Sequence, residues 1–204
     1  MTKFRLAIIA CAFTLLIVLA GVNIWHGLHP APRATVSQTD PSIRIGGPFS
    51  LTDQDGKPVT QEILKGKWSA VFFGYTFCPD VCPLTLQNLA HTQALLGDKA
   101  RNLQIIFITV DPARDTPANL KAYLDSNGFP KNVIGLTGSQ DAIDKVEKEY
   151  RATATKTGSG DSYGYSHTAV VYLMNPQGQF DVPLTASMTP QQNAQQIEQA
   201  MQGG

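Results

Sequence analysis

Two cysteines, Cys78 and Cys82, are separated by three residues. They follow an apolar run at residues 70–73 and precede an amphipathic pattern that begins at Pro83. This order predicts a strand, a short loop that holds both thiols, and a helix. Proline is favourable at the first helical position, because its missing N–H would have no partner there. We therefore expect both cysteines in front of the helix, near its free N–H groups and the positive end of its dipole, where thiolates are favoured.

Three roles suit a thiol pair in this position. The pair exchanges with disulfides of other proteins, binds a soft metal ion, or forms a structural disulfide. A structural disulfide gains nothing from a place that lowers thiol pKa values, so the two reactive roles are favoured. The spacing of the cysteines alone does not distinguish metal binding from thiol–disulfide exchange.

His167 is the candidate third ligand, because it lies directly before a buried strand and after a glycine-containing segment. Two thiolates and one imidazole suit copper in either oxidation state, whereas zinc requires a fourth ligand. Asp111 is a candidate for that ligand or for a contact behind the ligands, although its ordinary role is to cap the turn that leads to Thr116. Metal ligands must lose their protons, so affinity should fall on acidification.

The rest of the pattern predicts an α/β fold. Strands are expected at residues 68–73, 103–110, 133–136, 168–174 and 179–182, helices at 83–96, 117–127, 140–150 and 190–201, a hairpin at 49–59, and an extended loop or hairpin at 151–166. This order predicts a mixed sheet with helices on both faces. Sites in such sheets lie beyond the carboxyl ends of the strands, so Cys78 and Asp111 should share one edge.

Composition and the N-terminal residues set the expected compartment. Sixteen basic and sixteen acidic residues give a net charge of zero, so no electrostatic footprint for nucleic acid exists. Lys3 and Arg5 precede an uncharged stretch at residues 6–22, close to the roughly 20 residues of a membrane span. Basic residues at the start keep that end cytoplasmic and send the remainder outward. A cleaved signal peptide would have a shorter apolar region and a better cleavage site.

We therefore expect three parts. Residues 1–26 form a membrane anchor, the proline-containing residues 27–44 form a flexible tether, and residues 45–204 form the folded domain. This arrangement is a single span in the inner (cytoplasmic) membrane, with the C-terminal domain in the periplasm.

Three features of the sequence resemble the Sco/SenC family. They are residues 73–83 (FGYTFCPDVCP), residues 110–117 (VDPARDTP), and His167 before a hydrophobic strand. The resemblance extends from about Gly47 to the end of the chain. It implies a thioredoxin-like fold anchored to a membrane, with copper, Cu(I) or Cu(II), bound by Cys78, Cys82 and His167. It further implies delivery of copper to, or reduction of thiols in, the dinuclear copper site of cytochrome c oxidase subunit II.

The sequence thus predicts a copper chaperone rather than an enzyme. The alternatives are an extracytoplasmic thiol–disulfide oxidoreductase, with Cys78 and Cys82 as its redox pair and no essential role for His167, and a redox or copper sensor. Thioredoxin-like oxidoreductases usually carry a proline before the strand that begins here at Thr168, and this chain has Ser166 and His167 instead. Outside the cytoplasm the thiols oxidise, so we expect a thioredoxin-like reductant as a partner. An upstream copper donor is a further candidate partner of a copper chaperone.

Overall fold

The computed structural model of the 204-residue chain describes residues 13, 18, 44–126, 128–185 and 187–203. The chain divides into two compact units, residues 1–37 and 38–204, and the second contains the folded domain. The predicted anchor and tether lie outside the described residues, apart from Phe13, Val18 and Arg44. No helix within the described residues is long and apolar enough to cross a membrane.

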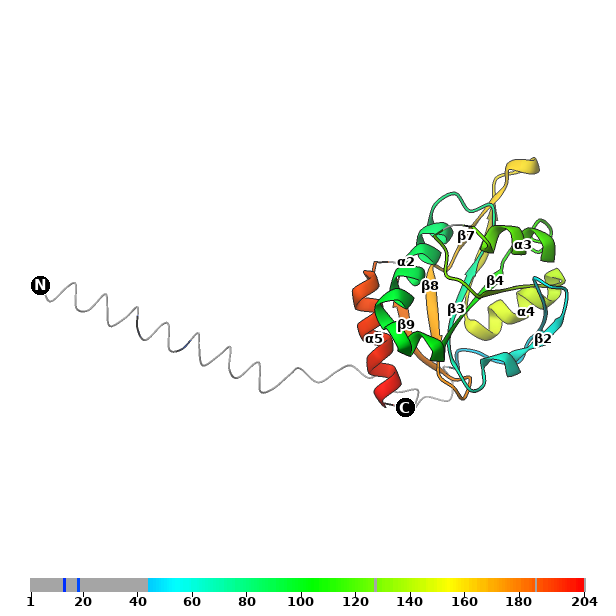
Figure 1. Cartoon of the computed structure of the whole chain (residues 1–204). Helices are drawn as coiled ribbons and strands as arrows, with labels where there is room; N and C mark the ends of the chain where they lie inside the picture. Colours follow the sequence, from blue (N-terminus) through cyan, green and yellow to red (C-terminus); the bar gives the residue numbers. More distant parts are fainter. Residues whose placement is uncertain (1–12, 14–17, 19–43, 127, 186, 204) are drawn as a thin grey trace, which may run out of the picture. The chain divides into compact units, whose positions relative to one another are not determined.

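A seven-stranded mixed sheet forms the centre of the domain (Figure 1). Its strands are β1 (Ser50–Asp53), β2 (Pro58–Thr60), β3 (Trp68–Gly74), β4 (Leu103–Thr109), β5 (Val133–Thr137), β8 (Val170–Met174) and β9 (Phe180–Thr185), in the order β2-β1-β5-β4-β3-β8-β9. The central strands β3, β4 and β5 are parallel, and the outer strands pair antiparallel. All residues of β3 are buried, as expected for a strand covered on both faces.

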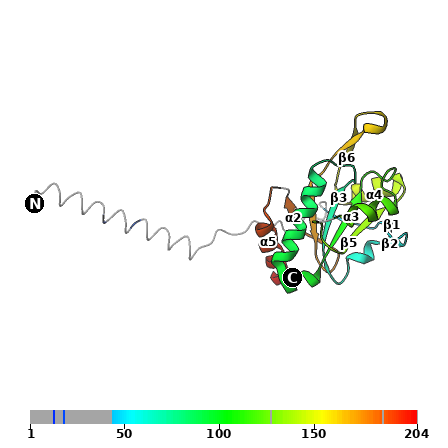
Figure 2. The ribbon, with the colours of Figure 1, turned by 45° about the horizontal axis from the view of Figure 1, so that its top comes forward.

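Helices cover both faces of this sheet, as predicted. They are α2 (Val81–Leu96), α3 (Pro117–Leu124), α4 (Gln140–Tyr150) and α5 (Pro190–Gly203), with short 3-10 helices at Gln61–Leu64, Gly97–Asn102 and Gly160–Ser162. Successive strand residues point to opposite faces. Phe73 accordingly contacts Tyr150 of α4, whereas Phe72 contacts Phe107, whose ring also meets Tyr123 of α3. Helices α2 and α5 pack side by side (Figures 1 and 2).

Three helix starts lie where capping residues predict them. The side chain of Thr116 accepts a hydrogen bond from the N–H of Asn119, and that of Ser139 from the N–H of Ala142. Thr189 and Gln192 form a reciprocal capping box at the start of α5.

The start of α2 differs from the prediction. The helix begins at Val81, two residues before Pro83, so Cys82 lies in its first turn rather than in front of it. The first N–H groups of a helix have no intrahelical partner, so proline at the third position removes no hydrogen bond. Pro83 therefore does not distinguish a helix that starts at Pro83 from one that starts at Val81.

Residues 151–166, predicted as an extended loop or hairpin, contain a hairpin. Strands β6 (Ala154–Thr157) and β7 (Gly164–His167) pair antiparallel, with Ala154 opposite His167. We call this pair the β6–β7 ribbon. It forms its own two-stranded sheet and projects from the rest of the domain (Figures 1 and 2). His167 is therefore held on an element that shares no strand pairing with the central sheet among the described residues.

Glu147 on α4 makes the stability of the domain depend on pH. Burial raises its pKa to about 7, and the nearby Asp144 adds to the shift. The folded chain therefore binds the proton more tightly than the unfolded chain, and this contribution is lost as pH rises from about 4.5 through about 7. We expect Glu147→Gln to stabilise the chain at pH 8 by about 1 kcal/mol, a value reduced for partial exposure, and to have no effect at pH 4. Urea unfolding at both pH values measures this, and an equal effect at both would contradict it.

Candidate metal site

Cys78, Cys82 and His167 meet beyond the carboxyl end of β3. Their candidate ligand atoms all lie within 4.8 Å of one another. Cys82 Sγ is 3.4 Å from His167 Nε2, and the backbone N–H of Cys82 donates to Cys78 Sγ at 3.5 Å. Both cysteines are free thiols. The structure thus brings together the three residues that the sequence predicts as metal ligands.

The two thiols differ in exposure. Cys78 follows a turn in which its N–H donates to the carbonyl of Tyr75 at 3.2 Å, and its side chain is half-buried. Cys82 has no exposed surface. At Gly74, a Cβ atom would lie 2.9 Å from Cys82 Sγ and 2.8 Å from the ring of Phe107, so only glycine leaves room for this sulfur.

The expectation of a favoured thiolate is wrong for Cys82. Burial raises the pKa of Cys82, and this effect outweighs the hydrogen bond from Tyr75 that lowers it. The reason is that removal from water penalises the charged form more than a helix N-terminus favours it. The Cys82 thiolate therefore needs a positive charge at the site, which a bound metal ion supplies.

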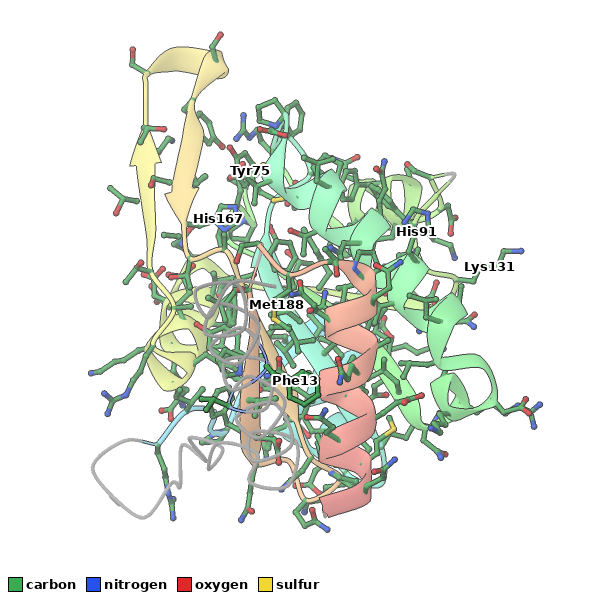
Figure 3. All side chains as sticks on the ribbon, turned by 90° about the vertical axis from the view of Figure 1, so that its left-hand side faces the viewer. Phe13, Tyr75, His91, Lys131, His167 and Met188 are labelled. Atoms are coloured by element: carbon green, nitrogen blue, oxygen red, sulfur yellow. The ribbon has the colours of Figure 1, made fainter. Side chains whose placement is uncertain are left out.

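The ring of His167 is oriented for metal binding. Its Nδ1 lies 3.1 Å from the carbonyl oxygen of Thr168, which can only accept, so Nδ1 carries the proton and Nε2 presents its lone pair toward Cys82. Burial lowers the pKa of His167, which keeps the ring neutral. The rings of Tyr75 and Phe72 contact it edge-on, and Figure 3 shows Tyr75 beside it, with His91 apart from both on α2.

Asp111 has other partners. Its carboxylate accepts hydrogen bonds from Arg114 Nε and, at 2.9 Å, from the hydroxyl of Tyr163. Its carbonyl accepts from the N–H groups of Arg114 and Asp115, so it caps the turn as its ordinary role predicts. Within the described residues, the group of possible metal ligands contains the two cysteines and His167 but not Asp111. The fourth ligand that zinc requires is therefore not supplied by this carboxylate.

Asp115 is a residue that the sequence analysis did not single out. It is buried, and its carboxylate accepts hydrogen bonds from the N–H of Thr76 at 3.0 Å and from the hydroxyls of Thr76 and Thr109, each at 2.6 Å. It thereby joins the loop before Cys78 to the end of β4. The motif VDPARDTP contains Asp115 as a second aspartate, and this was the available signal in the sequence. Aspartate is rarely buried without partners, so an aspartate next to a buried strand indicates a hydrogen-bonded role.

The family model described as SCO1/SenC matches residues 37–202. The chain is 38% identical over 179 residues to Protein SCO2, mitochondrial, of Saccharomyces cerevisiae, covering 86% of this chain and 59% of that protein. It is 43% identical over 138 residues to Protein SCO1 homolog 1, mitochondrial, of Arabidopsis thaliana, covering 67% of this chain and 41% of that protein. The chain thus spans about half the length of these curated relatives.

Solved structures agree with the family match. ScoI of Bradyrhizobium japonicum with copper bound is 45% identical, with a TM-score of 0.69 over 76% of this chain and 98% of that one. ScoI of Arabidopsis thaliana with copper bound is 36% identical, with a TM-score of 0.74 over 78% and 99%. The predicted thioredoxin-like α/β fold is confirmed. By sequence and by fold, the chain belongs to the SCO1/SenC family.

Proposed function

We propose that this protein is a membrane-anchored copper chaperone. Cys78, Cys82 and His167 bind the ion, and the protein delivers it to the dinuclear copper site of cytochrome c oxidase subunit II or reduces the thiols of that site. The observation that carries this proposal is the neutral ring of His167, whose unprotonated Nε2 faces Cys82 Sγ at 3.4 Å. A half-buried imidazole in this orientation is prepared for a metal ion.

The distances fit one ion. Bonds of about 2.3 Å to sulfur and about 2.0 Å to nitrogen place the ligand atoms of one site roughly 3.5–4.5 Å apart. The three candidate atoms lie within 4.8 Å of one another, so a small closure would complete the site. Two soft thiolates with one imidazole favour copper. A site with three protein ligands suits copper better than it suits zinc, which requires a fourth ligand. The relatives solved with copper bound support the same choice of metal.

Transfer of the ion requires that a partner's ligands reach it. Cys82 is buried, whereas Cys78 is half-buried and follows the exposed Phe77. A partner's thiol or imidazole therefore approaches past Cys78, and Cys82 and His167 hold the ion from behind until the new bonds form. The basic residues before the uncharged stretch at residues 6–22 support a periplasmic location for this exchange.

Thiol–disulfide exchange is the second candidate function. The two sulfur atoms lie within 4.8 Å of each other. A disulfide switch is identified in BsSco, a Sco protein of solved structure that is 28% identical to this chain, and this supports a redox role for the pair. In that case Cys78 is the attacking thiol, because Cys82 is buried. A Cys82→Ser variant would then accumulate mixed disulfides with partner proteins in cells that lack copper, whereas a chaperone would not. A redox or copper sensor would use the same residues and differ in its partner.

Copper loading is expected to require reduced cysteines, because a disulfide offers no thiolate ligands. The full chain, reduced and then freed of reductant without oxygen, should bind one Cu(II) per chain with a sulfur-to-copper charge-transfer band. The same chain, first oxidised to the Cys78–Cys82 disulfide, should show no band until a thiol reductant is added. Absorption titration of both forms measures this. Equal copper binding by the oxidised chain would contradict both the ligand set and the need for a reductant partner.

A further inference from the structure

The β6–β7 ribbon carries His167 but has no strand pairing with the central sheet among the described residues. Its last residue must nevertheless hold Nε2 3.4 Å from Cys82 Sγ. The chain joins the base of the ribbon to the domain, because Ala154 follows α4 and His167 precedes β8, which begins at Val170. Beyond this base, side-chain contacts hold the ribbon against the domain. The orientation of the third ligand therefore depends on the contacts between the ribbon and the cysteine loop as well as on the chain that leads into β8.

Arg114 lies between these two elements. Its guanidinium carbon is 4.5 Å from the centre of the Phe77 ring, next to Cys78, and 3.6 Å from the centre of the Tyr163 ring, next to β7. Its Nη1 donates to the carbonyl of Tyr163 at 3.0 Å, and its Nε donates to the carboxylate of Asp111. A single side chain thus contacts the cysteine loop, its own loop and the residue directly before β7, at the turn end of the ribbon.

Tyr163 connects the ribbon to Arg114 and Asp111 through both its hydroxyl and its ring. Its hydroxyl donates to Asp111 at 2.9 Å, and Lys156 of β6 lies 3.5 Å from the centre of its ring. Its ring also contacts Tyr165, at 5.9 Å between centres. Tyr163 therefore joins both strands of the ribbon to the Arg114–Asp111 pair.

Aromatic contacts continue from there to the metal site. Tyr165 contacts Tyr75 at 5.6 Å between ring centres, and Tyr75 contacts His167 at 5.9 Å. Figure 3 shows Tyr75 and His167 adjacent at this end of the sheet. A displacement at Tyr163 would thus be transmitted through packed rings to the imidazole.

Stability alone does not account for Arg114. Its side chain is 17% exposed, its partner carboxylate is fully buried, and its Nη2 is buried without a hydrogen-bond partner among the described residues. An unpaired buried donor costs free energy, and a buried ion pair is often no more stable than apolar residues of similar volume. The arrangement does, however, supply a planar cation that fits between two rings, which a lysine cannot replace.

We propose that Arg114 is a positioning residue that clamps the β6–β7 ribbon to the cysteine loop and so fixes His167 at the copper site. This inference rests on the proposed function for its metal. Cu(I) is well held by two thiolates, whereas Cu(II) gains more from the imidazole. Arg114 therefore sets the preference of the site for Cu(II) relative to Cu(I), although it touches none of the three ligands.

The first test uses the full chain without copper. In Arg114→Ala, amide hydrogen exchange in residues 154–167 should accelerate about tenfold or more, while the amides of β3 keep their native rates. Arg101→Ala removes an exposed arginine whose ion pair, within the part of the chain that the structure describes, is with Asp98, and it is the matched control that should change neither region. Arg114→Lys keeps a cation beside Asp111, so it folds even if the alanine variant does not, and it should accelerate the ribbon to an intermediate extent.

The second test measures copper affinity by competition with chelators. Arg114→Ala should lower Cu(II) affinity about 10–100-fold, the range found when partners of metal ligands are removed, and change Cu(I) affinity by less than about threefold. Tyr163→Ala should reproduce this loss, and the double variant should be no weaker than either single one, because both substitutions release the same clamp.

Three results would overturn the proposal. They are native exchange rates in the ribbon, accelerated exchange in β3 as well as the ribbon, and equal losses of Cu(I) and Cu(II) affinity. If the native chain bound no copper, the proposed function would fail, while the exchange experiment on the copper-free chain would still decide whether Arg114 clamps the ribbon.

Discussion

Replacement of His167 by alanine is expected to weaken Cu(II) binding by more than about 100-fold, since removal of a mere partner of a metal ligand already costs about 10–100-fold. The substitution removes the only nitrogen ligand of the described group and leaves the two cysteine sulfurs as ligands. The sulfur-to-copper charge-transfer band should shift or disappear, while Cu(I), which two thiolates can hold, should be retained more strongly. Chelator competition and absorption spectra of the full chain measure both effects.

His91→Ala is the matched control for this experiment. His91 is exposed on α2 and does not belong to the group of candidate metal ligands, so its removal should leave the copper affinity and the spectrum unchanged. Far-UV circular dichroism of both variants verifies that the fold persists. An unchanged Cu(II) affinity in His167→Ala would remove the main support for a three-ligand copper site and favour the oxidoreductase.

The second large effect is expected at Asp115. In Asp115→Ala, three donors lose their acceptor: the N–H and hydroxyl of Thr76 and the hydroxyl of Thr109. Each unsatisfied buried group costs about 1–3 kcal/mol, and we expect a total loss of about 3 kcal/mol after relaxation and water entry. Because Thr76 lies two residues before Cys78, the cysteine loop should loosen as well.

Asp115→Asn separates hydrogen bonding from charge. Burial raises the pKa of Asp115, so its charge is costly to the fold, and the asparagine amide can still accept from the N–H of Thr76 while a threonine hydroxyl rotates to accept from it. We therefore expect the asparagine variant to remain within about 1 kcal/mol of the native chain. Urea unfolding compares the two variants. Equal destabilisation of both would show that charge, rather than the acceptors, is what the loops require.

Features encoded within a few residues were predicted well. Thr116, Ser139 and Thr189 each cap the expected helix, because a cap involves only the next three residues. The strand before the cysteines and the mixed sheet were also correct, since apolar runs of this length report burial on both faces. The predicted start of α2 was wrong, because proline is tolerated throughout the first turn and therefore does not identify the first residue of the helix.

Features that depend on distant segments could not be derived from local pattern. The burial of Cys82, which raises its pKa, follows from packing against β3 and is invisible in the spacing of the cysteines. Asp115 bonds Thr76 across 39 positions, and Arg114 bonds Tyr163 across 49. His167 was identified by its place before a strand and by family resemblance, and only the structure gives its tautomer. The membrane anchor at residues 1–26 stays a prediction.

The metal site depends on the absence of a Cβ atom at Gly74 as well as on its three ligand atoms. A methyl group there would overlap the sulfur of Cys82 and the ring of Phe107, at 2.9 Å and 2.8 Å. To transfer the two cysteines and the histidine into another protein of this architecture, one must therefore also place a glycine at the position that corresponds to Gly74. A graft that copies only the ligands would leave no room for the buried sulfur that corresponds to Cys82.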